Sequence, residues 1–554
     1  MIVRVVSLYL LDDCGGIILN GRVISDSAGE KTFCGVMGSS VIDYCICSYD
    51  LLKCITEFRI DSKPFFDHMP LSIKFCVVED KSTKAISLPP KIPWVQKNCE
   101  QYRNHLSNLV SVTYLQSEIS IQEKLDVCID KIKCASIKYQ VKKHFVPRND
   151  WFDAKCENFR QRMLKSLDTY RDTGLDVDRI RYTQNRSKYT KLCDEKKLDK
   201  KIANINKLNT VKNSAEWWKL ANFLRKNTPK VGNNLSSSDF YNYFKSLLCD
   251  SNFTQQLQWC SDFRIDPFLD SPFELRELGI VLKTLKTGKA PGEDRISYEF
   301  YVNAPIAYQE EVLLLFNRIF LTESIPNSFL RSIVVPCFKK GDVNTVSNYR
   351  GLSLLDSVYK IFTGLILSRL NSWLECHNII NEYQAGFRKN YSTVDNLFNL
   401  TSIVNLNFYQ EKRTYAFFVD FSAAFDRIPR NALLYKLATI GLSSKILNIF
   451  KKLYNGTSCQ VWDGSSLSES FTVSQGVKQG CLLSPVLFSI YLNDLSDFLP
   501  CGVEIAGTVV KVLMYADDIV LLADSPENLQ LMINALYDYC SCWSLKLNLD
   551  KSKI

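Results

Sequence analysis

The chain has 554 residues, of which 46% are hydrophobic and 12% aromatic, and its formal net charge at pH 7 is +9. This length predicts about two to four domains, and the apolar content excludes a largely disordered chain. The positive charge permits a polyanionic partner. Twenty cysteines without a Cys-x-x-Cys pair, and only four histidines, argue against a zinc site. No run of about 18 apolar residues occurs, so the sequence predicts an intracellular, soluble protein without a membrane span.

Residues 1–78 contain short apolar runs separated by turn residues. Residues 41–44 are predicted to form a strand that carries Asp43. The adjacent pair Asp67 and His68 suits phosphodiester hydrolysis, in which a carboxylate orients an imidazole that contacts the phosphate. A loop aspartate beside a surface histidine is the alternative interpretation, and the pair alone does not decide between them.

The order of the motifs in this region is more informative than the pair. Asn20-Gly-Arg22, Thr32-Phe33, residues 40–44 and Asp67-His-x-Pro-Leu71 follow one another in the chain. This order resembles the last third of an endonuclease/exonuclease/phosphatase domain of a LINE-type (non-LTR) retrotransposon. The resemblance implies that Asp43, Asp67 and His68 are catalytic-site residues. Phe66 stands where that family usually has Ser, and its upstream metal-binding Glu and Gly-Asp-x-Asn segment are absent. We therefore expect an α/β-sandwich remnant without nuclease activity.

Residues 79–265 are predicted to form a helical, basic connector that begins at a proline-rich linker around Pro89. Basic residues crowd between positions 179 and 201, and Tyr182 and Tyr189 lie among them. Such a pattern suits contact with nucleic-acid phosphates and bases. Because acidic residues are interspersed, a solvated helix face explains the same pattern, and both interpretations remain open.

A Gly/Pro-rich loop, Gly288-Lys-Ala-Pro-Gly292, follows a predicted amphipathic helix over 275–285. Residues 333–338 are predicted to form a strand, after which come Lys339, Lys340 and Arg350. Two lysines and an arginine around one turn could grip a triphosphate, with Arg supplying its fork geometry. Ordinary surface charge at a hairpin is the alternative.

Three carboxylates are predicted at the ends of buried strands. Asp420 ends an apolar strand that starts at Thr414, and Asp517-Asp518 occupy the turn of a hairpin within residues 510–523. Unpaired charges next to a core are disfavoured unless something neutralises them, and hard carboxylate oxygens suit Mg²⁺. If the two strands are neighbours in one sheet, the carboxylates converge within roughly 10 Å and bind two Mg²⁺ ions for nucleotidyl transfer. An ordinary Asp-Asp turn is the alternative for the hairpin alone.

Two further segments lie between Asp420 and the hairpin in the chain. Phe425 comes a little over one helical turn after Asp420, where a helix is predicted from Ser422. Its ring could fill the space that a ribose 2′-hydroxyl needs, although core packing is the commoner role of such a residue. Gln479 and Gly480 belong to a glycine-containing loop, and Ser484 is predicted to cap the next helix.

Taken together, the motifs over roughly residues 275–554 resemble the reverse transcriptase domain of LINE-type elements. They are Gly288–Gly292, the 338–350 segment, Gln384-x-Gly-Phe-Arg388, Phe418–Asp426, Gln479–Pro485 and Tyr515-Ala-Asp-Asp518. The resemblance implies an α+β fold, in which a right-hand polymerase with fingers and palm occupies residues 266–554. It further implies Asp420, Asp517 and Asp518 as metal-binding catalytic residues. Nucleotide contacts would come from Lys339 or Lys340, Arg350, Phe425 as a sugar gate, Gln479 and Gly480.

The implied activity is RNA-directed DNA polymerisation, which extends a DNA primer or target on an RNA template with dNTPs. Mg²⁺ is the expected cofactor, and Mn²⁺ is a possible substitute. In this family a helical thumb follows the palm, so we expect the truncated chain to be poorly processive or inactive. The alternatives are an inert, element-derived nucleic-acid-binding fragment and a group II intron-like maturase. A protein of this class is expected in the nucleus and cytoplasm, and its protein partners are unknown.

Overall fold

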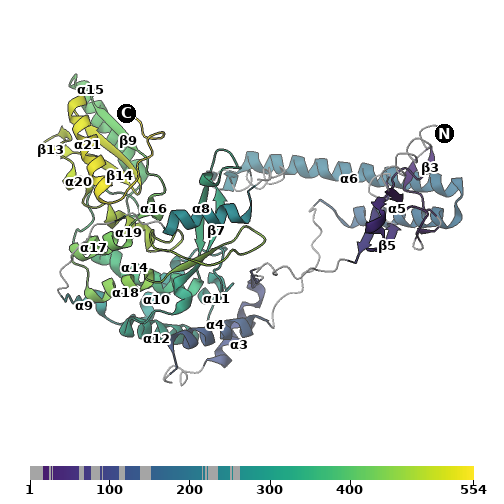
Figure 1. Cartoon of the computed structure of the whole chain (residues 1–554), viewed down its shortest axis with the longest axis horizontal. Helices are drawn as coiled ribbons and strands as arrows, with labels where there is room; N and C mark the ends of the chain where they lie inside the picture. Colours follow the sequence, from purple (N-terminus) through teal and green to yellow (C-terminus); the bar gives the residue numbers. More distant parts are fainter. Residues whose placement is uncertain are drawn as a thin grey trace. The chain divides into compact units, whose positions relative to one another are not determined.

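The computed structural model of the chain (Figure 1) contains two compact units, which comprise residues 1–84 with 143–230 and residues 85–142 with 231–554. The structure describes residues 16–23, 26–27, 29–35, 37–61, 68–76, 88–89, 91–110, 119–137, 151–211, 213–214, 216–218, 221, 235–249, 253 and 263–554. Among these residues, no helix is long and apolar enough to cross a bilayer.

The first unit combines short strands with two long helices. The strands among its described residues form three antiparallel pairs: β1 (Gly16–Ile18) with β4 (Ile46–Ser48), β2 (Phe33–Gly35) with β3 (Gly38–Ser40), and β5 (Ile55–Ile60) with β6 (Leu71–Phe75). A short helix, α2 (Tyr49–Leu52), follows β4, and the long helices are α5 (Ala154–Thr173) and α6 (Asp176–Thr210). Gly174 ends α5 with a φ of +65°, a left-handed conformation that glycine adopts without strain. Strands and helices share one core, formed by Leu19, Cys34, Phe58, Ile60, Met69, Met163, Leu167, Tyr170 and Tyr182.

The predicted strand over 41–44 is wrong. These residues form an irregular connection between β3 and β4. The hydroxyl oxygen of Thr32 accepts hydrogen bonds from the backbone N–H groups of Ile42 and Asp43, at 3.0 and 2.9 Å. A side chain therefore satisfies the backbone that a neighbouring strand would otherwise pair.

Part of the basic stretch 179–201 has a structural role. Arg179 and Arg186 donate hydrogen bonds to the backbone oxygens of Gly35 and Cys34, at 3.1 and 3.4 Å. These guanidinium groups satisfy carbonyl groups of β2 from the side of α6. Contact with nucleic acid through the other basic residues of this stretch remains a prediction.

The predicted connector over 79–265 is divided between the two units. Helices α5 and α6 belong to the first unit, whereas α3 (Cys99–Leu109) and α4 (Ile121–Ile137) belong to the second. The Tyr102 hydroxyl of α3 donates to the carbonyl of Phe300 at 2.9 Å, and both residues are buried in the main core of the second unit.

Two sheets organise the second unit. In the first, β7 (Arg331–Phe338) and β8 (Tyr349–Leu354) form an antiparallel hairpin, which confirms the predicted strand. Strand β10 (Ser458–Val461) runs parallel to β7, and β11 (Phe471–Thr472) completes the order β11-β10-β7-β8. Helix α8 (Ser237–Cys249) packs on this sheet through Phe240, Phe244 and Leu247.

The second sheet has the order β14-β15-β9, with β14 (Val512–Tyr515), β15 (Asp518–Ala523) and β9 (Tyr415–Val419) all antiparallel. The hairpin predicted around Tyr515–Asp518 is confirmed. Alternate residues such as Val419 and Ile519 enter the main core, on the face covered by α21 (Pro526–Cys542). Leu513 and Leu522 point to the opposite face, where α15 (Thr393–Tyr409) contributes Ile403. A small hairpin of β12 (Val503–Ile505) and β13 (Thr508–Val510) lies beside them.

Helices fill the rest of the second unit. Helix α10 (Leu275–Thr284) confirms the predicted amphipathic helix. The further helices are α9 (Pro267–Asp270), α11 (Tyr298–Val302), α12 (Ile306–Thr322), α13 (Asn327–Leu330), α14 (Ser357–Cys376), α16 (Ala424–Arg427), α17 (Arg430–Thr439), α18 (Ser444–Tyr454), α19 (Ser484–Tyr491) and α20 (Leu495–Phe498). The helix expected from Ser422 starts two residues later, because Ala423 adopts a left-handed conformation with φ +51°.

Candidate active site

Asp420 and Asp518 lie opposite each other at the end of the β14-β15-β9 sheet. Strand β15 pairs with β9 so that Ile519 faces Val419, and one step further along the antiparallel register brings Asp518 opposite Asp420. Directly opposed residues place their side chains on the same face, with Cβ atoms about 5 Å apart. Both carboxylates line one cleft together with Tyr515. The expected convergence of these two residues therefore follows from strand register.

Asp517 occupies the two-residue turn between β14 and β15, next to Ala516, whose φ is +59°. The pKa of Asp518 is raised because its carboxyl is partly buried and because the charges of Asp517 and Asp420 are nearby. The three negative charges thus act on one another, as expected for a site that a cation would stabilise.

The carboxylates offer chemistry that suits a divalent cation. Oδ2 of Asp420 is shielded from solvent and accepts no hydrogen bond from the described residues, although Nζ of Lys551 lies 3.4 Å away. A buried carboxylate oxygen that accepts no hydrogen bond and lies beside a second carboxylate fits a hard cation. As they stand, no three His, Cys, Asp or Glu side chains of the described chain form a ready metal-binding group.

Gln384 holds the turn that carries Asp517. Its side chain is fully buried, and its Oε1 accepts hydrogen bonds from the N–H groups of Ala516 at 2.9 Å and Gly386 at 2.8 Å. Its Nε2 donates to the carbonyl of Ala516 at 3.4 Å. A Cβ on Gly386 would lie 2.2 Å from the backbone nitrogen of Ala516, so this close approach requires glycine. Sequence reasoning found the Gln-x-Gly motif but missed its role, since only the fold shows that it contacts the turn.

The last residues of the chain hold Asp420 from the other side. The carbonyl of Asp420 accepts a hydrogen bond from the N–H of Asn548 at 2.8 Å, and its N–H donates to Oγ of Ser552 at 3.2 Å. Phe418 and Lys553 exchange two backbone hydrogen bonds, at 2.8 and 3.0 Å. The segment therefore acts as a partial fourth strand beside β9 and brings Lys551 to the carboxylate.

The predicted phosphate-binding cations gather around the β7–β8 hairpin. Burial and the positive charges of Arg350, Lys551 and Lys340 lower the pKa of Lys339, and the charge of Asp420 opposes this effect. The charges of Lys339 and Arg350 in turn favour the ionised form of Asp518. The structure thus brings the cations and the carboxylates within electrostatic reach of each other, with positive charge available for a polyphosphate.

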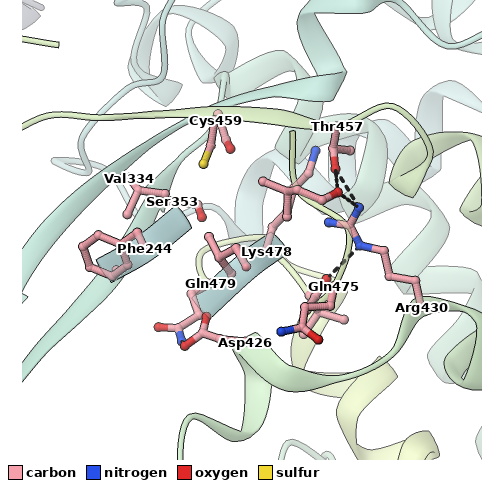
Figure 2. A pocket seen from close by; sticks show the side chains of 16 residues that line it. Phe244, Val334, Ser353, Asp426, Arg430, Thr457, Cys459, Gln475, Lys478 and Gln479 are labelled. Atoms are coloured by element: carbon pink, nitrogen blue, oxygen red, sulfur yellow. Dashed lines mark hydrogen bonds between the residues drawn. The ribbon is translucent and has the colours of Figure 1, made fainter. Parts of the chain in front are cut away.

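The glycine-containing loop and Asp426, the residue after Phe425, line a neighbouring pocket, shown in Figure 2. Phe425 stacks on Phe488 of α19, with ring centroids 4.6 Å apart and planes 14° from parallel. The carbonyl of Gln479 accepts a hydrogen bond from the N–H of Ser353 at 2.8 Å. Gly480, with φ +122°, approaches the same residue so closely that a Cβ would lie 2.6 Å from its oxygen.

Two polar side chains brace this loop from below. Arg430 is buried, and its guanidinium donates to the loop carbonyl of Gly476 at 3.2 Å and to Oγ1 of Thr457 at 2.7 Å (Figure 2). It also donates to the carbonyls of Tyr454 and Val473, each at 2.6 Å. The predicted cap at Ser484 is wrong, because its hydroxyl donates to the carbonyl of Lys478 at 2.8 Å. That bond ties the start of α19 to the loop instead.

The part of the chain that carries this arrangement matches a known protein family. Residues 338–554, which contain the carboxylates and the loop, match the family described as reverse transcriptase (RNA-dependent DNA polymerase). The chain contains a reverse transcriptase domain. The resemblance proposed from the motifs is therefore confirmed for this part of the chain.

Relatives of the reverse transcriptase domain come from transposons. The chain is 31% identical over 290 residues to the RNA-directed DNA polymerase from mobile element jockey of Drosophila funebris, covering 50% of this chain and 31% of that protein. It is 28% identical over 289 residues to the probable RNA-directed DNA polymerase from transposon BS of Drosophila melanogaster, covering 51% and 32%. The chain thus spans about a third of the length of these relatives. A solved apo telomerase from Candida tropicalis matches with a TM-score of 0.31 and 18% identity, over 41% of this chain and 50% of that one.

Outside the reverse transcriptase domain, the first unit brings together two of the residues predicted for an endonuclease. Nδ1 of His68 lies 2.8 Å from Oδ2 of Asp43, and the His68 ring meets Phe33 edge to face at 5.4 Å. Asp67 lies outside the described residues. The structure therefore joins Asp43 to His68 across 25 residues of sequence, while their chemical role remains a prediction.

Proposed function

We propose that this chain is an RNA-directed DNA polymerase of a non-LTR retrotransposon, which adds dNTPs to a primer 3′-hydroxyl on an RNA template. The observation that carries the proposal is the register that sets Asp420 opposite Asp518, beside the cations of the β7–β8 hairpin. The reverse transcriptase match over residues 338–554 supports the same reaction.

Asp420, Asp517 and Asp518 would hold divalent cations, for which Mg²⁺ is our proposal and Mn²⁺ a substitute. When bound, two such ions supply activation of the primer hydroxyl and charge neutralisation at the leaving pyrophosphate. The chain's own groups would fix the carboxylates through the hydrogen bonds of Gln384 and Asn548 described above.

The nucleotide would lie between the cations and Phe425. Lys339, Lys340 and Arg350 would bind the triphosphate, because the charges of Lys339 and Arg350 act on Asp518 and Lys340 lies next to Lys339. Phe425, held by its stack on Phe488, would exclude a ribose 2′-hydroxyl. Gln479 and Gly480 would contact the nucleotide or the template. Template RNA and primer or target DNA are the proposed macromolecular partners, available to the chain in the nucleus and cytoplasm.

Primer extension on an RNA template, with Mg²⁺, tests the proposal. The full chain should extend the primer, and replacing both Asp517 and Asp518 by Asn should abolish synthesis. Asp538→Asn, which removes an exposed carboxylate of α21, serves as the matched control and should leave synthesis unchanged. Synthesis that survives in the double variant would contradict the assignment of the carboxylates.

We further propose that residues 1–78 are the C-terminal part of an endonuclease/exonuclease/phosphatase domain that lacks nuclease activity. The contact between His68 and Asp43 supports the origin. The described strands of this part form three separate pairs rather than one continuous sheet. The full chain should therefore not nick supercoiled plasmid in Mg²⁺. Nicking that disappears in His68→Ala would refute this.

A further inference from the structure

Asp426 is a carboxylate beside the proposed nucleotide pocket for which the proposed chemistry gives no role. It lies in α16 directly after Phe425 and lines the same pocket as Gln479. Its Oδ2 accepts a hydrogen bond of 2.7 Å from Nε2 of Gln479. In Figure 2 the two side chains meet at the edge of the pocket.

The backbone around this contact is fixed independently of it. The N–H of Val477 donates to the carbonyl of Phe425 at 2.9 Å, and a Cβ on Gly476 would lie 2.6 Å from the carbonyl oxygen of Asp426. On the other side, the N–H of Ser353 holds the carbonyl of Gln479. Since the backbone of the loop is held from both sides, the Gln479 side chain can still change only the orientation of its amide.

A primary amide has two ends of nearly equal shape and opposite hydrogen-bonding character. An ionised carboxylate can only accept, so it selects the flip in which Nε2 faces Asp426 and Oε1 faces away. We propose that Asp426 is a positioning residue, which fixes the amide of Gln479 and thereby determines the hydrogen-bonding atom offered to the incoming nucleotide. The role of the nucleotide rests on the proposed function, whereas the coupling of the two side chains does not.

The charges around Asp426 make its ionisation sensitive to pH. Arg427 on the same helix and Arg350 of β8 favour the carboxylate, and Tyr243 of α8 also faces it. Burial outweighs both arginines and raises the pKa of Asp426 to about 7. Below this pH a protonated carboxyl can donate to Oε1 of Gln479 and permits the opposite flip. The orientation is therefore better defined at pH 8 than at pH 6.

Single-nucleotide addition on an RNA template tests the proposal in kinetic terms. In Asp426→Asn either flip is allowed, because an asparagine amide both donates and accepts. We expect the KM for the dNTP to rise about tenfold at pH 8, because the variant loses one charge-assisted hydrogen bond. The kcat should stay within about threefold, and the change of KM between pH 6 and 8 should disappear. Asp538→Asn is the control for removal of a carboxylate.

A second substitution separates positioning from folding. In a Gln479→Leu background, Asp426→Asn should have no further effect on KM, because the group that it orients is gone. A purely structural role of Asp426 predicts instead a lower kcat and melting temperature with the pH profile retained. That result, or an unchanged KM in the single variant, overturns the proposal.

A readout without catalysis distinguishes this proposal from the proposed function. With nitrogen-15-labelled glutamine, the side-chain amide resonance of Gln479, assigned with Gln479→Leu, should titrate near pH 7 in the full chain. The titration should be absent in Asp426→Asn. If the chain extends no primer, the polymerase proposal fails and this titration still supports the coupling. A Gln479 resonance that ignores pH overturns it.

Discussion

Replacing Gln384 by Met tests whether the catalytic turn depends on one buried amide. Methionine is similar in length and fills the same volume, so packing changes little. It removes the acceptor for the N–H groups of Ala516 and Gly386 and the donor to the carbonyl of Ala516. The variant therefore isolates the hydrogen bonds from the space that the side chain occupies.

The structure sets the size of the effect. Leaving a buried N–H group without an acceptor costs about 1–3 kcal/mol. The two N–H groups give a loss of about 2–6 kcal/mol in the free energy of unfolding, unless the turn shifts to reach solvent. Such a shift would move Asp517 and Asp518, and a displacement of about 1 Å at a reacting centre can cost about a hundredfold in rate. We thus expect a loss of stability, a loss of kcat, or both.

Urea unfolding followed by circular dichroism measures the first quantity, and single-turnover primer extension measures the second. Gln530→Met, on the exposed side of α21, is the matched control and should change neither. If Gln384→Met unfolds at the wild-type urea concentration and keeps the wild-type kcat, the turn does not depend on this amide and the reasoning is refuted.

Three further substitutions test other contacts in the second unit. Burial raises the pKa of Asp426 to about 7, so between pH 4 and 7 the folded state binds a proton that the unfolded state does not, and stability falls as pH rises through this window. The fall in the free energy of unfolding is at most about 4 kcal/mol. Urea titrations at pH 4.5 and 7.5 should show a smaller fall in Asp426→Asn. Lys436 is buried, and its Nζ lies 3.9 Å from the Trp543 ring centroid. Burial lowers the pKa of Lys436 to about 8. The unfolded state therefore binds more protons above pH 8, and Lys436→Met should lose the rise in stability between pH 8 and 9.5. Phe425→Val removes the ring that stacks on Phe488, and discrimination against ribonucleotides, measured as a ratio of kcat/KM values, should fall by about tenfold or more.

The sequence alone was sufficient for the family and for the local structure around its motifs. The apolar runs on either side of Asp517 and Asp518 predict a hairpin, because a run of buried, β-branched residues is by itself enough to indicate a strand. Six motifs in one order indicate a reverse transcriptase because each has its own local chemistry. Boundaries were less well predicted where a single backbone conformation, such as that of Ala423, delayed a helix.

Only the tertiary structure decided which residues act together. The pairing of β15 with β9, which sets Asp518 opposite Asp420, joins segments about a hundred residues apart, and no local pattern encodes that register. The clamp of Gln384 on Ala516 and the contact of Gln479 with Asp426 likewise join distant parts of the chain. Helices α5 and α6 pack with the strands of the first unit, although their sequence indicates only a basic helical connector. Helical and strand periods report which face of an element is apolar, whereas the partner of that face is selected by packing across the whole fold.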